Sequence, residues 1–357
     1  QLEKYVIEAE VDILRELGVD IRCGVEVGKD ISIAQLRDEG YKAFYLAIGC
    51  QGGKLPGIPG ENAKGTSIAV RFLHDAAENQ QQELRGDVVV VGGGNVAIDC
   101  ARTAVRFGAD KVSLFCLESR DTMPATQEEI KEALEEGVAI QPGWGPKEVV
   151  TDEDGAVKAV VFKRCTSTID PETGRFNPQY DERETVTVDA EHVIFAIGQG
   201  IEWGGLLAGS GVQFWHGNYP VADSLTYQTA EPDVFVGGDV FTGPKFAIDA
   251  IEAGKCAAVS LHRYVQPGTS MTIGRNRRDF IELNKDDVVI DSYDTAGRQE
   301  AQRMAEADEA KHTFRNLSGT LTEEQVKMEA SRCLGCGASV VDENKCIGCG
   351  ICTTKCE

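Results

Sequence analysis

The sequence predicts an α/β protein whose main sheet is parallel and doubly wound. Three observations favour this class. Strand-like and helical segments alternate along most of the chain, residues 88–91 are apolar on every side as in a parallel strand buried on both faces, and a glycine-rich turn joins that strand to the next helix. With 357 residues, 42% of them hydrophobic, the chain is long enough for two or three domains with ordinary cores.

Hydrophobic spacing and chain-breaking residues place the elements in order. Residues 2–17 repeat apolar side chains at the helical period and stop at Gly18, which predicts an amphipathic helix, and residues 43–49 form an apolar run that predicts a buried strand. Thr322 and Gln325 form a capping box for a late helix. We expect further strands over residues 19–23, 88–91, 111–116, 157–164, 184–189, 192–198 and 233–237, and further helices after residue 32 and over 67–84, 95–107, 126–136, 245–264, 296–312 and 322–332.

The turn after residues 88–91 has the spacing Gly92-x-Gly94-x-x-Ala97. A dinucleotide pyrophosphate binds to bare backbone N–H groups at a helix N-terminus. Gly92 permits the tight turn, Gly94 lets the phosphates approach, and Ala97 keeps helix and strand close. We therefore predict a nicotinamide dinucleotide site. It comprises Gly92, Gly93, Gly94, Asn95, Val96 and Ala97.

A carboxylate follows the next predicted strand, about 20 residues beyond the glycine loop. Glu118 can accept hydrogen bonds from ribose hydroxyls and would repel a 2′-phosphate, which favours NADH over NADPH. Arg120 lies two residues further on and can still reach a phosphate. NADP(H) is therefore the less favoured alternative.

A second glycine-containing turn, Gly237-Gly238-Asp239, lies between an apolar strand and a helix that starts near residue 246. An aspartate at the carboxyl end of a strand can bond flavin or ribose hydroxyls. The N-terminus of the following helix would place positive dipole near the flavin N1–O2 edge. This segment predicts part of an FAD site.

Four motifs in order, GGGNVAIDCARTA, SRDTMPA (119–125), AIGQ (196–199) and GGDVFTGPKFAIDAIEAGKCAA, resemble the small subunit of glutamate synthase and related flavin- and nicotinamide-dependent reductases. The resemblance spans roughly residues 1–265. It implies two nested Rossmann-like domains, with hydride passing from NAD(P)H to FAD. The residues that it implies for the cofactors, beyond the glycine loop, are Gly198, Gly49, Gly238, Asp239, Phe246 and Ala247.

The resemblance implies the domain organisation up to residue 266, and the charged, weakly apolar sequence after it and the C-terminal cysteines predict the rest. We expect the remaining N-terminal part of an FAD domain at 1–84, the NAD(P) domain at 85–200, the C-terminal part of the FAD domain at 201–266, an acidic linker at 267–330 and an iron–sulfur segment at 331–357. The family's first βαβ unit, with the FAD pyrophosphate loop, would precede residue 1. We therefore expect this chain to be a fragment of a longer chain or hetero-oligomer.

The C-terminal cysteines have the spacing of a bacterial ferredoxin loop, Cys346-x-x-Cys349-x-x-Cys352-x-x-x-Cys356. This spacing predicts a [4Fe–4S] cluster. Cys333 and Cys336 can complete this cluster, help to hold a second one, or join Cys346 and Cys349 in a zinc site, and the sequence leaves these alternatives open. The six other cysteines are scattered and predict reduced packing residues.

A formal charge of -22 repels nucleic acid and anionic lipid, and no apolar run of 18 residues or basic leader is present, so we expect a cytoplasmic protein. We predict an NADH:acceptor oxidoreductase that delivers electrons through FAD and a [4Fe–4S] cluster to a partner protein or domain. The alternatives are a non-catalytic electron-transfer or docking subunit and a thioredoxin-reductase-like disulfide reductase, although no Cys-x-x-Cys pair occurs before residue 333.

Overall fold

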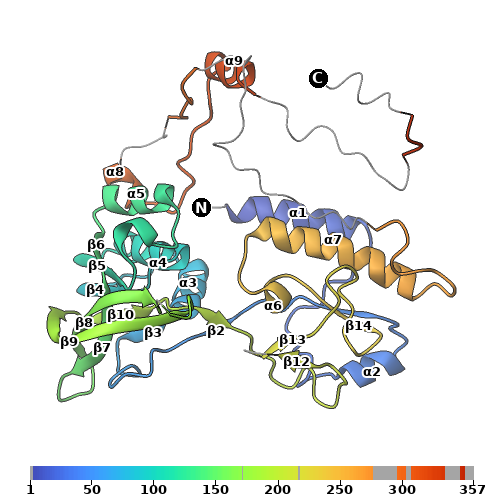
Figure 1. Ribbon diagram of the computed structural model, residues 1–357, viewed down its shortest axis with the longest axis horizontal. Helices are drawn as coiled ribbons and strands as arrows, with labels where there is room; N and C mark the ends of the chain where they lie inside the picture. Colours follow the sequence, from blue (N-terminus) through green and yellow to red (C-terminus); the bar gives the residue numbers. More distant parts are fainter. Residues whose placement is uncertain are drawn as a thin grey trace. The chain divides into compact units, whose positions relative to one another are not determined.

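The computed structural model describes residues 3–170, 172–215, 218–275, 296–302, 307–333 and 346–349. The chain divides into two compact units, residues 1–269 with 305–316 and residues 270–304 with 317–357. The larger unit contains the sheets and most of the helices, and the smaller one contains α9 (Glu323–Ser331), as Figure 1 labels them. The predicted capping box of α9 is confirmed, because the Thr322 side chain accepts a hydrogen bond from the Gln325 N–H.

A five-stranded sheet in the order β3-β10-β4-β5-β6 forms the centre of the larger unit, and all of its neighbours are parallel. This confirms the predicted α/β class. The strands are β3 (Thr66–Ile68), β4 (Asp87–Val91), β5 (Lys111–Cys116), β6 (Ala139–Pro142) and β10 (His192–Phe195). The helices that follow strands of this sheet are α3 (Ala69–Glu78), α4 (Asn95–Arg106) and α5 (Gln127–Glu135), with a short 3-10 turn, η1 (Arg120–Thr122), after β5.

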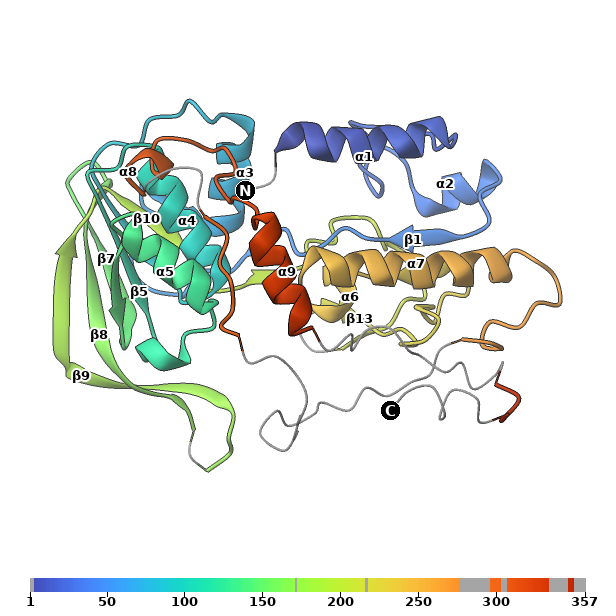
Figure 2. The same cartoon turned by 90° about the horizontal axis from the view of Figure 1, so that it is seen from above.

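Strand β4 is buried on both faces, as its all-apolar sequence predicts. Val88 and Val90 belong to the core cluster formed with α3, α4 and α5, whereas Val89 and Val91 belong to a second cluster on the opposite face. The second cluster is completed by an antiparallel sheet of β7 (Trp144–Thr151), β8 (Val157–Ile169) and β9 (Phe176–Asp189). Figure 2 shows the parallel sheet between these two layers.

The antiparallel sheet corrects one expectation. A doubly wound sheet carries helices on both faces, but α3, α4 and α5 all pack on the same face, and β7–β9 cover the other. The reason lies in the long strands β8 and β9, whose alternating apolar residues include Val160 and Phe162. The ring of Phe162 stacks on Phe115 of β5 at 4.0 Å between centroids, which fills the face that a helix would have covered.

A second, smaller sheet pairs β1 (Phe44–Leu46) in parallel with β14 (Val234–Val236). The chain therefore leaves this sheet, builds the five-stranded sheet and returns. Two short antiparallel pairs join further segments, β2 with β11 and β12 with β13. These and the remaining elements are α1 (Lys4–Glu16), α2 (Ile33–Asp38), β2 (Gly52–Gly53), β11 (Gln199–Gly200), β12 (Phe214–Trp215), β13 (Tyr219–Pro220), α6 (Asp239–Thr242), α7 (Ala247–Tyr264) and α8 (Ala307–Ala310).

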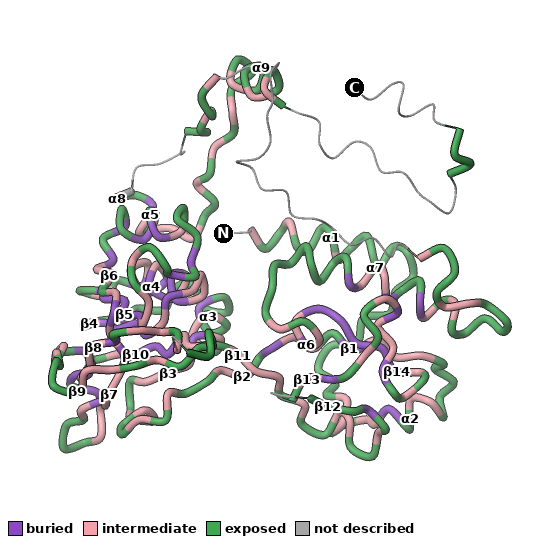
Figure 3. Tube along the Cα trace, viewed as in Figure 1, coloured by how far each residue is buried: buried purple, intermediate pink, exposed green. Residues whose placement is uncertain are grey.

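Helix α1 forms where the sequence predicts it, yet none of its 13 residues is buried. Its apolar stripe, which includes Ile7, Ile13 and Leu14, is exposed, and so are Ile248 and Ile251 of α7. Figure 3 shows both helices mostly in the colour of exposed residues. The spacing of apolar residues thus predicts the helix correctly, but it does not predict whether another element covers the apolar face of the helix.

Several predicted elements are wrong or shorter. The strands predicted over 43–49 and 192–198 are shortened to β1 and β10. Residues 19–23 form no strand, because no described segment offers a neighbouring strand to complete their hydrogen bonds. The helix predicted over 67–84 begins two residues later and ends at Glu78, where Asn79 leaves the helical conformation. Of the helix predicted over 296–312, the described residues include α8, whereas residues 296–302 are not helical.

Candidate functional site

A cavity of about 680 Å³ lies at the carboxyl ends of β4 and β5. In parallel α/β sheets this edge is where ligands bind, because the loops that leave the strands and the N-termini of the helices meet there. Most of the predicted nicotinamide-site residues line it: Gly92, Gly93, Gly94, Asn95, Val96, Glu118 and Gly198. Ala97 lies beneath it, fully buried between helix and strand, and Arg120 is not among the lining residues.

The three glycines of the loop differ in why a side chain is excluded. Gly92 has φ of 144°, and a Cβ there would lie 2.3 Å from the carbonyl oxygen of Ala196. A Cβ on Gly93 would lie 2.7 Å from a carboxylate oxygen of Glu118. Gly94 has an ordinary φ of -90°, and a Cβ would meet no protein atom within 4 Å. The space above Gly94 is therefore open for a ligand to approach the backbone.

The N-terminus of α4 offers unused hydrogen-bond donors to this space. Among the described residues, no acceptor is present for the backbone N–H groups of Gly93, Gly94, Asn95 and Val96, whereas the N–H of Ala97 bonds to the carbonyl of Gly94. These donors add to the positive end of the helix dipole, and α4 has no acidic residue in its first turn. The loop therefore fits a diphosphate.

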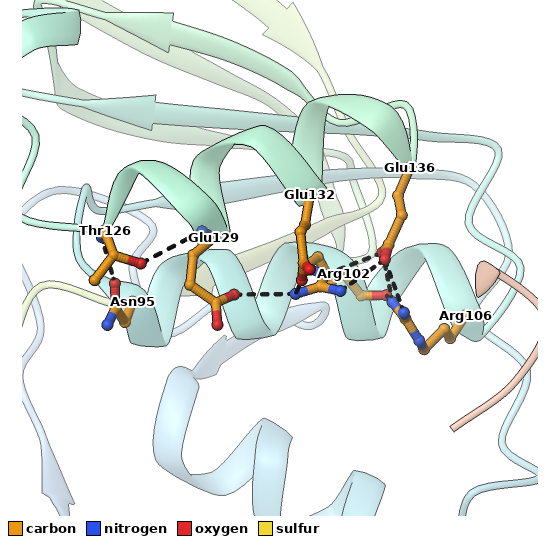
Figure 4. A network of polar contacts seen from close by, with 7 residues as sticks. All are labelled: Asn95, Arg102, Arg106, Thr126, Glu129, Glu132 and Glu136. Atoms are coloured by element: carbon orange, nitrogen blue, oxygen red, sulfur yellow. Dashed lines mark hydrogen bonds and ion pairs between the residues drawn. The ribbon is translucent and has the colours of Figure 1, made fainter. Parts of the chain in front are cut away.

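Two contacts hold the loop in this conformation. The side-chain oxygen of Asn95 accepts a hydrogen bond of 2.9 Å from the N–H of Thr126, and the carbonyl of Gly93 accepts one of 3.0 Å from the N–H of Ala125. Figure 4 shows the first of them at the start of α4 and α5. The segment that carries the sequence SRDTMPA therefore positions the glycine loop, and Thr126 is a residue of the site that sequence reasoning missed.

Glu118 lines the cavity directly beside the glycine loop. Its carboxylate is next to Gly93, and its carbonyl accepts a hydrogen bond of 2.9 Å from the N–H of Gly143. The neighbouring thiol of Cys116 is inert at neutral pH, because burial raises its pKa to about 12. The chemistry available here is thus that of a hydrogen-bond acceptor and not of a thiolate nucleophile.

A buried ion-pair network fixes α4 against α5 behind the loop (Figure 4). The carboxylate of Glu136, 3% exposed, accepts hydrogen bonds from Arg102 and Arg106 at 2.6 to 3.1 Å, and Arg102 also pairs with Glu129 and Glu132. Burial by itself would raise the pKa of Glu136, but the hydrogen bonds from the two arginines outweigh it and lower this pKa. The network stays charged at neutral pH and holds the direction of α4.

Arg106 also ties residues 305–316 to this helix. Its Nε donates a hydrogen bond of 3.0 Å to the carbonyl of Thr313, and the ring of Phe314 packs against Phe107 at 5.5 Å. This contact belongs to the larger unit, of which residues 305–316 are a part. The end of α4 opposite to the glycine loop is therefore anchored by a later segment of the chain.

The predicted flavin residues form a second cluster, at the carboxyl ends of β1 and β14. Gly49 and Gly238 both have φ of 69°, and the Cys50 thiol contacts the carbonyl of Asp239 at 3.3 Å, which brings the two loops together. The Asp239 carboxylate accepts a hydrogen bond of 3.2 Å from the N–H of Lys245.

Phe246 and Ala247 are exposed at the start of α7, and the N–H of Phe246 already bonds to Asp249. Asp239 begins the four-residue helix α6, which the sequence did not predict. The fit to a flavin thus rests on the backbone of Gly49 and Gly238 and on Asp239, and less on the start of α7.

Three of the six predicted cluster ligands are described. Cys333, Cys346 and Cys349 are exposed free cysteines, and the described residues contain no group of three or more metal-ligating side chains. Gly348, at φ of 68°, donates its N–H to the Cys346 sulfur at 3.4 Å. Cys336, Cys352 and Cys356 lie outside the described residues.

Known proteins resemble this chain in sequence and in fold. Residues 8–254, well over half of the chain, match the pyridine nucleotide-disulphide oxidoreductase family. The chain belongs to this family. The beta subunit of the NADP(+)-dependent formate dehydrogenase of Moorella thermoacetica is 33% identical over 94% of this chain and 48% of its own length. The NADPH glutamate synthase small chain of Escherichia coli (strain K12) is 29% identical over 74% of this chain and 59% of its own length.

The chain thus spans about half the length of these family members, and the resemblance to the glutamate synthase small chain is confirmed at this level. Among solved structures, FprA of Mycobacterium tuberculosis in complex with NADPH gives a TM-score of 0.52 at 18% identity, over 68% of this chain and 67% of that one. This likeness supports the fold. No described helix of this chain is both long and apolar enough to cross a bilayer.

Proposed function

We propose that this family member is the dinucleotide-oxidising part of an NADH-dependent flavoprotein oxidoreductase that passes electrons to an iron–sulfur cluster and then to a partner protein or domain. The observation that carries the proposal is the open space above Gly94, at a helix N-terminus where four N–H groups have no acceptor among the described residues. Such a cradle suits an anionic group, and the diphosphate of a dinucleotide fits it. The relatives named above are subunits of larger enzymes, which supports a partner.

The residues of the glycine loop and their neighbours each have a part in this proposal. The N–H groups of Gly93, Gly94, Asn95 and Val96 bind the diphosphate, and Asn95 and Thr126 hold the loop in position. The Glu118 carboxylate accepts hydrogen bonds from the adenosine ribose. Hydride transfer needs alignment of two rings and no acid–base pair, so these residues orient the donor and do not react.

For the flavin we propose Gly49, Gly238 and Asp239, whose backbone and carboxylate lie at the ends of β1 and β14. When bound, FAD supplies the conversion of a two-electron donor into one-electron transfers, which an iron–sulfur acceptor requires. The cysteines at 333, 336, 346, 349, 352 and 356 are the proposed ligands. The bond from the Gly348 N–H to the Cys346 sulfur is of the kind that tunes such clusters.

The choice of NADH rests on Glu118. Both relatives named above have NADP or NADPH in their names, but here a carboxylate lies beside Gly93, where a 2′-phosphate would meet like charge. We expect Glu118→Ala to raise the affinity for NADPH about tenfold, or ~1.4 kcal/mol, and to weaken NADH binding by a smaller factor. A ratio of the two dissociation constants equal to that of the unmodified chain would contradict the role of Glu118.

The decisive test is an anaerobic titration of the chain, supplied with FAD, with NADH. We expect bleaching of the flavin absorbance and electron transfer to an added one-electron acceptor. Gly94→Val is the matched variant, because its φ and its surroundings tolerate a side chain. A valine side chain would keep the diphosphate from two or more charge-assisted hydrogen bonds, each worth about 1.5–3 kcal/mol. NADH binding should therefore weaken roughly 100-fold or more. The loss of stability should be small and come from valine being a poorer N-cap than glycine.

Two outcomes would contradict this proposal. If the unmodified chain does not bind NADH, or if Gly94→Val binds it tightly, the glycine loop is not the pyrophosphate site. A coloured protein that NADH never bleaches would instead favour a docking or electron-transfer subunit without its own catalysis.

The cluster is tested separately by iron, sulfide and zinc analysis of anaerobically isolated protein. We expect iron and sulfide in equal amounts, their loss in Cys349→Ser, and their retention in Cys23→Ser, since Cys23 is exposed and free but lies far from the tail in sequence. If the unmodified chain contains zinc and no sulfide, the cysteines hold a tetrahedral zinc ion and not an iron–sulfur cluster.

A further inference from the structure

The cavity has a second wall, which the glycine loop and Glu118 leave unexplained. It is formed by strands β7, β8 and β9 of the antiparallel sheet, and its lining side chains are Trp144, Pro146, Lys163, Phe176, Pro178 and Tyr180. On β9 the three residues are spaced two apart, so they point to the same face of the sheet. An aromatic and proline-rich strand face thus faces the space in which the dinucleotide is proposed to bind.

This wall lies next to the loop that carries Glu118. A Cβ on Gly145 would lie 2.5 Å from the ring of Tyr180 and 2.9 Å from the side chain of Leu117, so both side chains touch this glycine. The N–H of Gly143 holds the carbonyl of Glu118 at 2.9 Å. Following the cavity away from Gly94, a ligand therefore meets first Glu118, then Leu117, and then the ring of Tyr180.

The aromatic side chains of the wall are held by cations. The Lys163 ammonium lies 4.1 Å from the centroid of the Tyr180 ring and is itself fixed by Glu182 at 2.7 Å. The guanidinium of Arg164 lies 5.3 Å from the Trp144 ring. No cation of the described residues lies over the Phe176 ring, and Phe176 is 64% exposed. An exposed aromatic ring on the rim of a cavity is a surface on which a planar group can stack.

We propose that this strand face, Trp144 with Phe176 and Tyr180, is the subsite for the adenine base of the dinucleotide. The order along the cavity is that of the ligand: diphosphate at the glycine loop, ribose at Glu118, base at the aromatic wall. Lys163 supplies a donor to the ring nitrogens of a purine, which are acceptors. The inference rests on the proposed dinucleotide site and adds the residues that recognise its adenosine half.

The test compares two donors, NADH and reduced nicotinamide mononucleotide, which lacks the adenosine half. Base stacking on an aromatic side chain is strong enough that Tyr180→Ala should weaken NADH binding about tenfold. Tyr180→Phe keeps the ring and should bind NADH as the unmodified chain does. Binding of the mononucleotide should be the same in all three proteins, because it does not reach the wall.

Phe176→Ala is the second variant, chosen because an exposed side chain can be removed without unfolding the sheet. It should weaken NADH and leave the mononucleotide unchanged, and AMP should compete with NADH in the unmodified chain but less well in this variant. NADH binding unaffected by both alanine substitutions, or equal losses for both donors, overturns the adenine subsite. No NADH binding by the unmodified chain would instead overturn the proposed function itself.

Discussion

Helices α4 and α1 are of nearly equal length and both are amphipathic, but they meet very different surroundings. Six residues of α4 are buried, against the sheet and against α3 and α5, whereas no residue of α1 is buried. The comparison shows that a periodic apolar stripe predicts a helix, while its burial depends on what the rest of the chain provides. Both regions have a buried core, but the region around β1 and β14 has a smaller one and leaves apolar faces exposed on α1 and α7.

The difference has a consequence for function. The cavity at the glycine loop is lined mostly by strands and helices that form a core with one another, and Pro244 is its one lining residue from the segment after β14. The stability of the two regions should therefore respond differently to matched substitutions.

The largest expected contrast is between two glycines with positive φ. Gly92→Val forces a β-branched residue to φ of 144° and places its Cβ 2.3 Å from the carbonyl oxygen of Ala196. Gly18 follows α1 with φ of 88°, and a Cβ added there would meet no atom within 4 Å beyond its chain neighbours. We expect Gly92→Val to cost about 4 kcal/mol of folding free energy and to abolish NADH binding. Gly18→Val should cost about 1 kcal/mol. Chemical denaturation measures both, and equal losses would remove the distinction.

Next comes a pair of leucines. Leu114 in β5 is 0% exposed and Leu14 in α1 is 46% exposed. Leu114→Ala creates a cavity in a packed core and should lower the free energy of unfolding by about 3 kcal/mol, while Leu14→Ala should change it by less than ~0.5 kcal/mol. If Leu14→Ala is as damaging as Leu114→Ala, the stripe of α1 has a partner in solution.

The smallest contrast concerns two aspartates and depends on pH. Burial, with the nearby charge of Glu129, raises the pKa of Asp99 in α4 to about 6, against an ordinary value near 4 in the unfolded chain. The folded state therefore binds this proton more tightly than the unfolded state does. As the pH rises from about 4 to 6, the ionisation of Asp99 lowers the free energy of unfolding of the protein. At pH 7, Asp99→Asn should stabilise the chain by about 2 kcal/mol, and the gain should vanish below pH 4.

Asp12 of α1 is the control for Asp99, because it is exposed and pairs with Arg15 on the surface. Asp12→Asn should change stability by less than ~0.5 kcal/mol, with little dependence on pH. Thermal melts of both variants across pH 4 to 7 give the comparison. A gain for Asp99→Asn that persists at pH 4 would show that the carboxylate is not the cause.

What the sequence predicted well was local. The run at 88–91, the glycines that follow it and the helix from Asn95 are specified by neighbours in the chain, so the loop and the position of Glu118 were found without the structure. Residues 19–23 were misread because a strand exists only with a partner. The positioning role of Thr126 arises from a contact across 31 residues, which no local pattern records.

The aromatic wall was also missed, although a signal was present. Phe176, Pro178 and Tyr180 alternate with polar residues in a segment that we had not assigned to a strand. Only the pairing of β9 with β8 turns this spacing into one face of a sheet, and only the packing of that sheet against β5 brings the face to the cavity.

The pairing of β1 with β14 determines the order in which parts of the chain can fold during synthesis. Phe44 lies opposite Val234, so a ribosome adding roughly 5–20 residues per second needs about 10 to 40 s to make the second strand after the first. During that interval the emerging first strand lacks its partner while the intervening segment can already fold. Newborn chains would then carry a folded five-stranded sheet beside an incomplete β1–β14 sheet, and chaperones would bind the apolar residues still exposed in the latter.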